Sequence, residues 1–269
     1  MNHLVSQGDM TTMTERFEPE IANSNNAARL EFRNVSMTFP DGTEALKEVS
    51  FSVAAGEFVT IVGPSGCGKS TLLRVASGLT THSNGECMSD RKSLGYVFQD
   101  ATLLPWRTVQ RNVELNAELQ GVPEAERRER ARQAIELVGL TGNEKKYPKQ
   151  LSGGMKMRTS LARSLVMKPK VFLFDEPFGA LDEITRERLN DEVLALFQHE
   201  GFAGMFITHS ITEAVYMSTR VLVMSPRPGR ITASFDIPFA YPRDHDLRYS
   251  PEFAELCGQV SHALRGDQS

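Results

Sequence analysis

One segment limits the possible folds of this chain more than any other. An apolar run at residues 58–62 leads into it, and a helix is expected to begin at Lys69 and continue to Ser77. The segment consists of Gly63, Pro64, Ser65, Gly66, Cys67, Gly68, Lys69, Ser70 and Thr71. Glycines allow the backbone to turn its N–H groups inward, and the start of a helix adds partial positive charge. The segment therefore predicts an α/β fold in which a strand, a loop and a helix together bind phosphate.

Two side chains at the end of this loop carry matching chemistry. Lys69 can reach the β- and γ-phosphates of a nucleotide, and the hydroxyl of Ser70 can ligate Mg²⁺. The alternative is a glycine-rich turn that binds nothing, which the flanking strand and helix disfavour. By itself the loop predicts a nucleoside triphosphate, and kinases, GTPases and motor proteins all share it.

Two carboxylates follow another apolar run, at residues 171–174. If this run is a buried strand, Asp175 and Glu176 lie at the carboxyl edge of the sheet, where the phosphate loop also lies. Asp175 is then placed to hold Mg²⁺, and Glu176 is placed to orient or deprotonate an attacking water. The alternative is a solvated acidic turn, since Pro177 comes next.

Strand-like and helix-like segments alternate along most of the chain. We expect strands at 30–39, 49–53, 58–63, 94–98, 171–174, 205–208 and 221–224. We expect helices at 69–77, 108–120, 123–138, 152–167, 184–199 and 211–217. Strands separated by helices predict a mainly parallel sheet that is covered on both faces.

The composition is that of an ordinary globular protein, and its net charge of −4 argues against nucleic acid as a partner. Residues 1–28 are polar, which predicts a disordered tail, although a true start at Met10 or Met13 would look the same. The three cysteines have no metal-ligand spacing, so we expect free thiols in a reducing compartment. Without a secretory signal or a membrane-spanning run, the chain is expected to stay in the cytoplasm.

A further segment, residues 151–154 (Leu-Ser-Gly-Gly), resembles the signature sequence of ABC-type ATPases, the nucleotide-binding subunits of ABC transporters. Other motifs of that family stand around it in the family's order. Phe39 is at the place of the aromatic residue that stacks on adenine, and Gln99 is at the place of the Q-loop glutamine. Asp182 matches the end of the D-loop, and His209 matches the switch histidine.

The resemblance covers about residues 30–231 and implies the P-loop NTPase fold of an ABC ATPase. The implied domain, at 29–235, has a mainly parallel RecA-like core, an antiparallel β subdomain and an α-helical subdomain at about 100–165. A short extension follows at 236–269, and we expect no regulatory domain in it. The resemblance also implies ATP and Mg²⁺ as cofactors and ATP hydrolysis as the reaction.

Each matching residue receives a role from the family. The implied catalytic residues are Glu176, His209, Gln99 and Lys69. The implied Mg²⁺ ligands are Ser70, Gln99 and Asp175. The implied ATP contacts are Phe39, the loop residues from Gly63 to Thr71, Asp182 and, from a second copy of the chain, Ser152, Gly153 and Gly154.

These contacts from a second copy imply a head-to-tail homodimer that closes on ATP. The further partners implied are two transmembrane permease subunits and a periplasmic or lipid-anchored solute-binding protein. The chain would then be a peripheral protein on the cytoplasmic face of the inner membrane.

Several positions depart from the family pattern. Met155 stands where the signature usually has Gln, and Ser210 replaces the usual Asp after the histidine, which puts contacts from those two groups in doubt. Phe39 lacks a tyrosine hydroxyl, although stacking needs only the ring. Residues 86–94 also look short for the usual strand hairpin.

Two stretches indicate a branch of the family. Residues 175–182 resemble importer subunits, and residues 103–109 and 224–231 resemble the nitrate/sulfonate/taurine group. The sequence therefore predicts uptake of a small anionic or polar solute of that kind. Trp106 is either a contact with a membrane subunit or a half-buried aromatic. Exporter subunits and ABC proteins that act on ribosomes or chromosomes are the alternatives.

Overall fold

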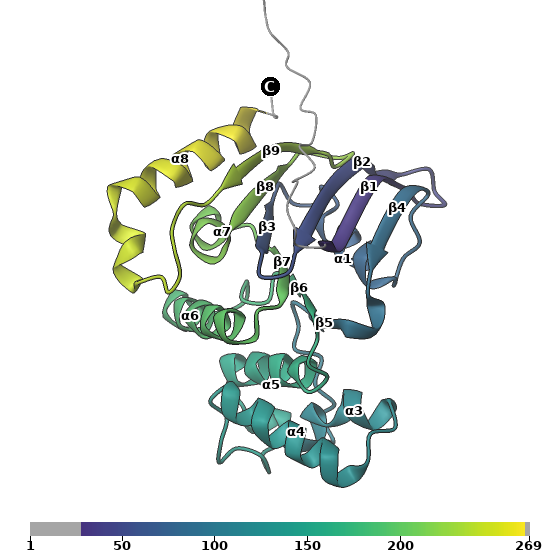
Figure 1. Ribbon diagram of the computed structural model, residues 1–269, viewed down its shortest axis with the longest axis vertical. Coiled ribbons are helices and arrows are strands. Elements are labelled where there is room, and N and C mark those ends of the chain that lie inside the picture. The colour runs from purple at the N-terminus through teal and green to yellow at the C-terminus, as the bar shows by residue number, and fades with distance from the viewer. Residues whose placement is uncertain (1–27, 267–269) are drawn as a thin grey trace, which may run out of the picture.

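The computed structural model describes residues 28–266, which form two sheets and a separate group of helices (Figure 1). The tail predicted at residues 1–28 lies, except for its last residue, outside the described part of the chain. In Figure 1 the helical group lies at the lower end and the smaller sheet lies at the upper right, while the larger sheet runs from β9 at the top to β5 just above the helical group.

The larger sheet has the strand order β5-β6-β7-β3-β8-β9. The first five strands in that order are parallel, as the alternation predicted, and β9 pairs with β8 in the antiparallel direction. The bounds are β3 Phe58–Val62, β5 Leu94–Val97, β6 Val171–Asp175, β7 Ala203–Ile207, β8 Arg220–Met224 and β9 Ile231–Asp236. No strand was expected at β9.

Both faces of this sheet are buried, and β6 shows how. Phe172 and Phe174 belong to one apolar cluster, whereas Val171 and Leu173, which point the other way, belong to a second cluster. The first cluster includes residues of α6 (Glu183–Glu200) and α7 (Ile211–Met217), and the second includes residues of α1 (Lys69–Ser77). Continuous burial along the strand therefore explains why its sequence does not alternate.

The smaller sheet is antiparallel and has the order β2-β1-β4, with β1 Ala28–Thr38, β2 Glu44–Ala54 and β4 Asn84–Ser89. β4 is a single edge strand, and a short 3-10 helix, Arg91–Ser93, connects it to β5. The segment that looked short for a hairpin thus holds the end of one strand. At the other end of the chain, α8 (Pro251–Gly266) buries Phe253 and Val260 and packs on α7.

The helical group consists of α2 Val109–Val113, α3 Leu115–Leu119, α4 Glu124–Leu137 and α5 Gly153–Leu165. The helix predicted at 108–120 is divided into α2 and α3 at Glu114, whose backbone nevertheless stays right-handed helical (φ −63°, ψ −18°) and keeps its N–H bonded to the Gln110 carbonyl oxygen. The Glu114 carboxylate is fully buried and is paired with Arg111 and Arg127. The two arginines compensate the buried charge of this carboxylate, which would be costly without partners.

Phe58 lies at the centre of the first cluster, and its ring contacts Phe174, Phe197 and Phe206. Phe58→Ala is expected to lower the free energy of unfolding by about 3–5 kcal/mol, because it leaves a cavity where four rings meet. Leu79→Ala is the control, since that side chain is 65% exposed. Urea unfolding followed by circular dichroism measures both variants, and equal effects would contradict this account of the core.

Candidate nucleotide-binding site

The phosphate loop runs from the end of β3 to the start of α1, as the sequence predicted. Its backbone needs glycine at Gly66 and Gly68, where φ is +75° and +109°. Gly68 also approaches β2 so closely that a Cβ there would lie 2.7 Å from the carbonyl oxygen of Ala45. Because a side chain would be excluded at this position, the loop can rest directly against the smaller sheet.

Lys69 places its charge inside this loop. Its buried side chain donates hydrogen bonds from Nζ to the carbonyl oxygens of Gly63 (2.8 Å) and Pro64 (3.0 Å). Both acceptors are uncharged, so the charge of the ammonium group stays available to a phosphate. Together with the helix N-terminus, Lys69 makes the loop a site for an anion.

Oxygen atoms that could ligate a metal ion lie beside the loop, at the carboxyl end of β6. The Ser70 hydroxyl donates to Asp175 Oδ1 at 2.9 Å, and the Tyr96 hydroxyl donates to Asp175 Oδ2 at 3.2 Å. Within residues 28–266 no group of three or more His, Cys, Asp or Glu residues could hold a metal ion. A hydroxyl and one carboxylate nevertheless fit Mg²⁺, which takes few protein ligands and completes its shell with water and phosphate oxygens.

The other carboxylate, Glu176, contacts His209, which follows the neighbouring strand β7. His209 Nδ1 lies 3.4 Å from Glu176 Oε2, and both side chains reach solvent. Glu176 has a φ of +45°, a conformation that costs energy in a residue other than glycine. Its N–H donates to the carbonyl oxygen of Ile207, so the neighbouring strand β7 holds this backbone in place. A carboxylate base and an imidazole thus lie in direct contact at the edge of the site, where both can reach an attacking water.

A cavity of about 440 Å³ lies beside these groups, although Asp175 itself does not line it. Its lining is Phe39, Ala45, Ser65, Gly66, Gly68, Lys69, Ser70, Thr71, Gln99, Glu176, His209 and Arg227. The structure therefore brings together the predicted adenine contact Phe39, the phosphate loop, the predicted Q-loop residue Gln99 and the pair Glu176 and His209. A second cavity, of about 420 Å³, lies where β6 begins and contains none of the predicted residues.

The remaining predicted contacts lie outside this cavity. Ser152 caps α5, because its hydroxyl accepts a hydrogen bond from the Met155 N–H at 3.3 Å. Asp182 caps α6 in the same way and accepts from the Thr185 N–H at 2.9 Å, a contact that lowers the pKa of the carboxyl. Gly153 and Gly154 begin α5 beside Ser152. One copy of the chain thus does not bring these residues to its own phosphate loop.

Three residues near the site were not predicted from the sequence. Tyr96 contacts Asp175, and Arg227 lines the cavity. Glu213 accepts a hydrogen bond from the hydroxyl of Thr208, the residue before His209, and burial raises the pKa of this carboxyl. Glu213 thus contacts the residue before the histidine, whereas the carboxylate that the sequence analysis put in doubt belongs to position 210. The available signal was its position in the first turn of α7, four residues after His209.

Several known proteins are similar to this chain over most of its length. Residues 46–179 match the ABC transporter family. An ATP-binding protein of Brucella abortus is 43% identical over 89% of this chain and 95% of its own length. A taurine import ATP-binding protein of Rhizobium johnstonii is 42% identical over 83% of this chain and 90% of its own. An aliphatic sulfonates import ATP-binding protein of Bacillus cereus is 39% identical over 81% of this chain and 87% of its own length.

Solved structures agree in fold. The cbiO1 protein of Clostridium perfringens, part of an ABC transporter complex, has a TM-score of 0.73 and 27% identity, over 84% of this chain and 92% of that chain. A dimeric ATP-binding cassette in a post-hydrolysis state with ADP and Pi has a TM-score of 0.69 and 30% identity, over 78% of this chain and all of the other. The chain therefore belongs to the ABC transporter ATP-binding family and is an ATPase with the P-loop NTPase fold.

Proposed function

We propose that the chain is the ATPase subunit of a bacterial importer and hydrolyses MgATP between two copies of itself. The observation that carries this proposal is the division of the site. The phosphate loop, Glu176 and His209 share one cavity, whereas Ser152 begins a helix elsewhere. A second copy, placed head to tail, would bring its Ser152–Gly154 segment to the nucleotide of the first copy.

Within one half-site, each group has a task that suits its position. Phe39 stacks on adenine, and the N–H groups of the loop together with Lys69 bind the phosphates. Ser70, Asp175 and Gln99 hold Mg²⁺, which neutralises charge on the β- and γ-phosphates when it is bound. Glu176 orients and deprotonates the attacking water, and His209 holds that water near the γ-phosphate.

The second copy completes the anion site. The N-terminus of α5, with Ser152, Gly153 and Gly154, carries partial positive charge and two residues without side chains. Asp182 precedes α6 and contacts the nucleotide or its partner loop across the same interface. ATP would then hold the two copies together, and loss of the γ-phosphate would release them.

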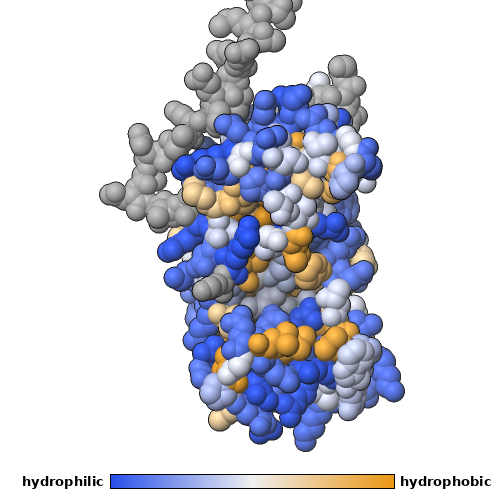
Figure 2. Space-filling view, turned by 90° about the vertical axis from the view of Figure 1, so that its right-hand side faces the viewer, coloured by the Kyte–Doolittle hydropathy of each residue, from blue (hydrophilic) through white to orange (hydrophobic). Residues whose placement is uncertain are grey.

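A membrane partner is supported by apolar side chains on the helical group. Trp106 and Leu119 are 70% and 76% exposed, which is unusual for large apolar side chains. Hydrophobic residues gather in a band across the lower, helical part of one face of the molecule (Figure 2). Within residues 28–266 no helix is long and apolar enough to cross a membrane. We propose that this part binds a permease subunit, on the cytoplasmic face of the membrane.

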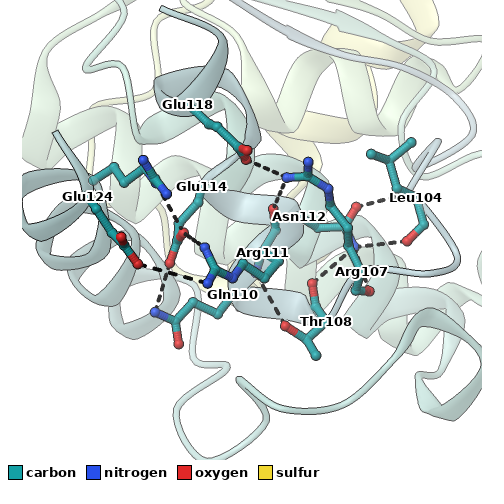
Figure 3. Close-up of polar contacts among 10 residues, drawn as sticks. Leu104, Arg107, Thr108, Gln110, Arg111, Asn112, Glu114, Glu118 and Glu124 are labelled. Atoms are coloured by element: carbon teal, nitrogen blue, oxygen red, sulfur yellow. Dashed lines mark hydrogen bonds and ion pairs between the residues drawn. The ribbon is translucent and has the colours of Figure 1, made fainter. Parts of the chain in front are cut away.

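The loop that carries Trp106 is held rigidly (Figure 3). The buried Asn112 accepts a hydrogen bond from the Leu104 N–H and donates from Nδ2 to the carbonyl oxygens of Leu104, Arg107 and Thr108. Arg107 also pairs with Glu118 of α3. A fixed loop loses little conformational entropy when a partner binds, so Trp106 suits a contact residue.

The solute class rests on the relatives that import taurine and aliphatic sulfonates. We propose a small anionic or polar solute, delivered by a solute-binding protein. We expect a strain without this gene to lose growth on taurine or an alkanesulfonate as sole sulfur source, and to grow normally on sulfate. Restoration by the wild-type gene but not by a Lys69→Ala gene is the control. Unimpaired growth on both sulfur sources would contradict this solute class.

Glu176→Gln is expected to reduce ATP turnover by at least about a hundredfold, because the amide cannot accept the proton of the attacking water. Nucleotide binding should persist, since the γ-phosphate gains a neutral neighbour. Phosphate release measures turnover, and the control is Glu200→Gln, at the far end of α6. If Glu176→Gln turned over ATP at the wild-type rate, Glu176 could not be the base.

Trp106→Ala is expected to weaken binding of the permease by about tenfold or more, since a large exposed aromatic residue would lose its contact area. MgATP binding by the free subunit should not change, because Trp106 does not line the nucleotide cavity. Co-purification with membranes that contain the permease tests this. Tyr249→Ala, just before α8 and 74% exposed, is the control because it lies outside the helical group, and equal losses in both variants would count against the assignment.

A further inference from the structure

We propose that Arg227 is a further nucleotide-binding residue, which holds the phosphate loop in shape through Gly66 and adds a fixed positive charge to the cavity. The inference rests on the proposed binding of MgATP at this loop. Arg227 is one of two arginine or lysine residues that line the cavity, and Lys69 is the other.

The contact of Arg227 with the loop is double. Nε and Nη2 of Arg227 donate to the carbonyl oxygen of Gly66, at 3.2 and 3.0 Å. Gly66 has a φ of +75°, so its peptide is turned in a way that an ordinary residue resists. Two donors from one planar guanidinium fix the direction of this carbonyl, and with it the turn that leads to Gly68 and Lys69.

The backbone around Arg227 is itself fastened to the site. Arg227 lies in the connection between β8 and β9. In that connection the Gly229 N–H donates to the Ala45 carbonyl, and the Gly229 carbonyl accepts from the Lys47 N–H, both at 3.0 Å. A Cβ at Gly229 would lie 2.2 Å from the carbonyl oxygen of Cys67, so the connection also packs directly on the phosphate loop. Arg227 is therefore exposed at the surface and yet held in one place.

The charge of Arg227 is not cancelled by a close partner. Among residues 28–266 no carboxylate lies within ion-pair distance of its guanidinium. Its field reaches Asp41, whose pKa is lowered first by a hydrogen bond from the Thr43 N–H and to a lesser degree by Arg227. The acceptor of Arg227 in the loop is an uncharged carbonyl, so the guanidinium keeps its full positive charge. This charge lies beside the phosphate loop and therefore attracts the polyanionic nucleotide to the cavity.

The same connection offers a matched control. Arg230 lies three residues later and is also exposed, but its guanidinium faces Glu48 at 3.5 Å and does not line the cavity. Replacement of Arg230 removes the same charge from the same connection without touching the phosphate loop. A general effect of net charge would therefore appear in both variants, and a site-specific effect only at Arg227.

The test is the affinity of the full-length chain for MgADP, measured by isothermal titration calorimetry. Arg227→Met keeps the aliphatic stem and is expected to weaken binding by about tenfold. Arg227→Lys keeps the charge and one donor, so its loss should be clearly smaller. Arg230→Met should remain within about twofold of wild type. Equal melting temperatures of the Arg227 variants and wild type show that the fold is kept.

Two results would overturn the inference. One is wild-type affinity in Arg227→Met, and the other is an equal loss in Arg227→Met and Arg230→Met. If Arg227→Met should fail to fold, Arg227→Lys decides alone, and wild-type affinity at every salt concentration would then count against the bidentate contact. Lys69→Ala separates this inference from the proposed function. If Lys69→Ala binds MgADP normally, the nucleotide site itself is wrongly placed; if only Lys69→Ala loses binding, the inference about Arg227 alone fails.

Discussion

The close approach of Gly68 to the carbonyl of Ala45 is the constraint on which the rest of the site depends. It brings the phosphate loop of the parallel sheet against β2 of the antiparallel sheet. Phe39 directly follows β1, which pairs with β2, so the predicted adenine contact and the phosphate loop line one cavity. A side chain at Gly68 would force the two sheets apart, because the backbone oxygen it would meet cannot move aside. The positive φ of Gly68 is a second, independent reason why only glycine suits this position.

The sequence predicted those parts of the site whose position follows from local structure. A strand, a glycine-rich turn and a helix place the loop, and the end of a buried strand places Asp175 and Glu176. The parallel sheet was predictable for the same reason, since alternating strands and helices leave few other arrangements.

Site residues whose contacts depend on the order of strands in the sheet could not be predicted from the sequence. Tyr96 meets Asp175 because β5 pairs with β6, and Arg227 meets Gly66 because β8 pairs with β3. Neither pairing is visible in spacing along the chain. The ion pair of Glu114 was not predictable for a related reason, because Arg127, which helps to hold its carboxylate, lies on a different helix.

The structure of one copy presents two kinds of helix N-terminus at separate places. The start of α1 closes the phosphate loop, whereas the start of α5 is capped by Ser152 and does not line the cavity at that loop. We propose that both N-termini contact the same ATP molecule, which is bound between two copies of the chain. The molar mass of the Glu176→Gln chain, measured by light scattering with and without MgATP, tests this most directly. The account predicts one copy without nucleotide and two with it; a chain that binds MgATP and remains a single copy would contradict it.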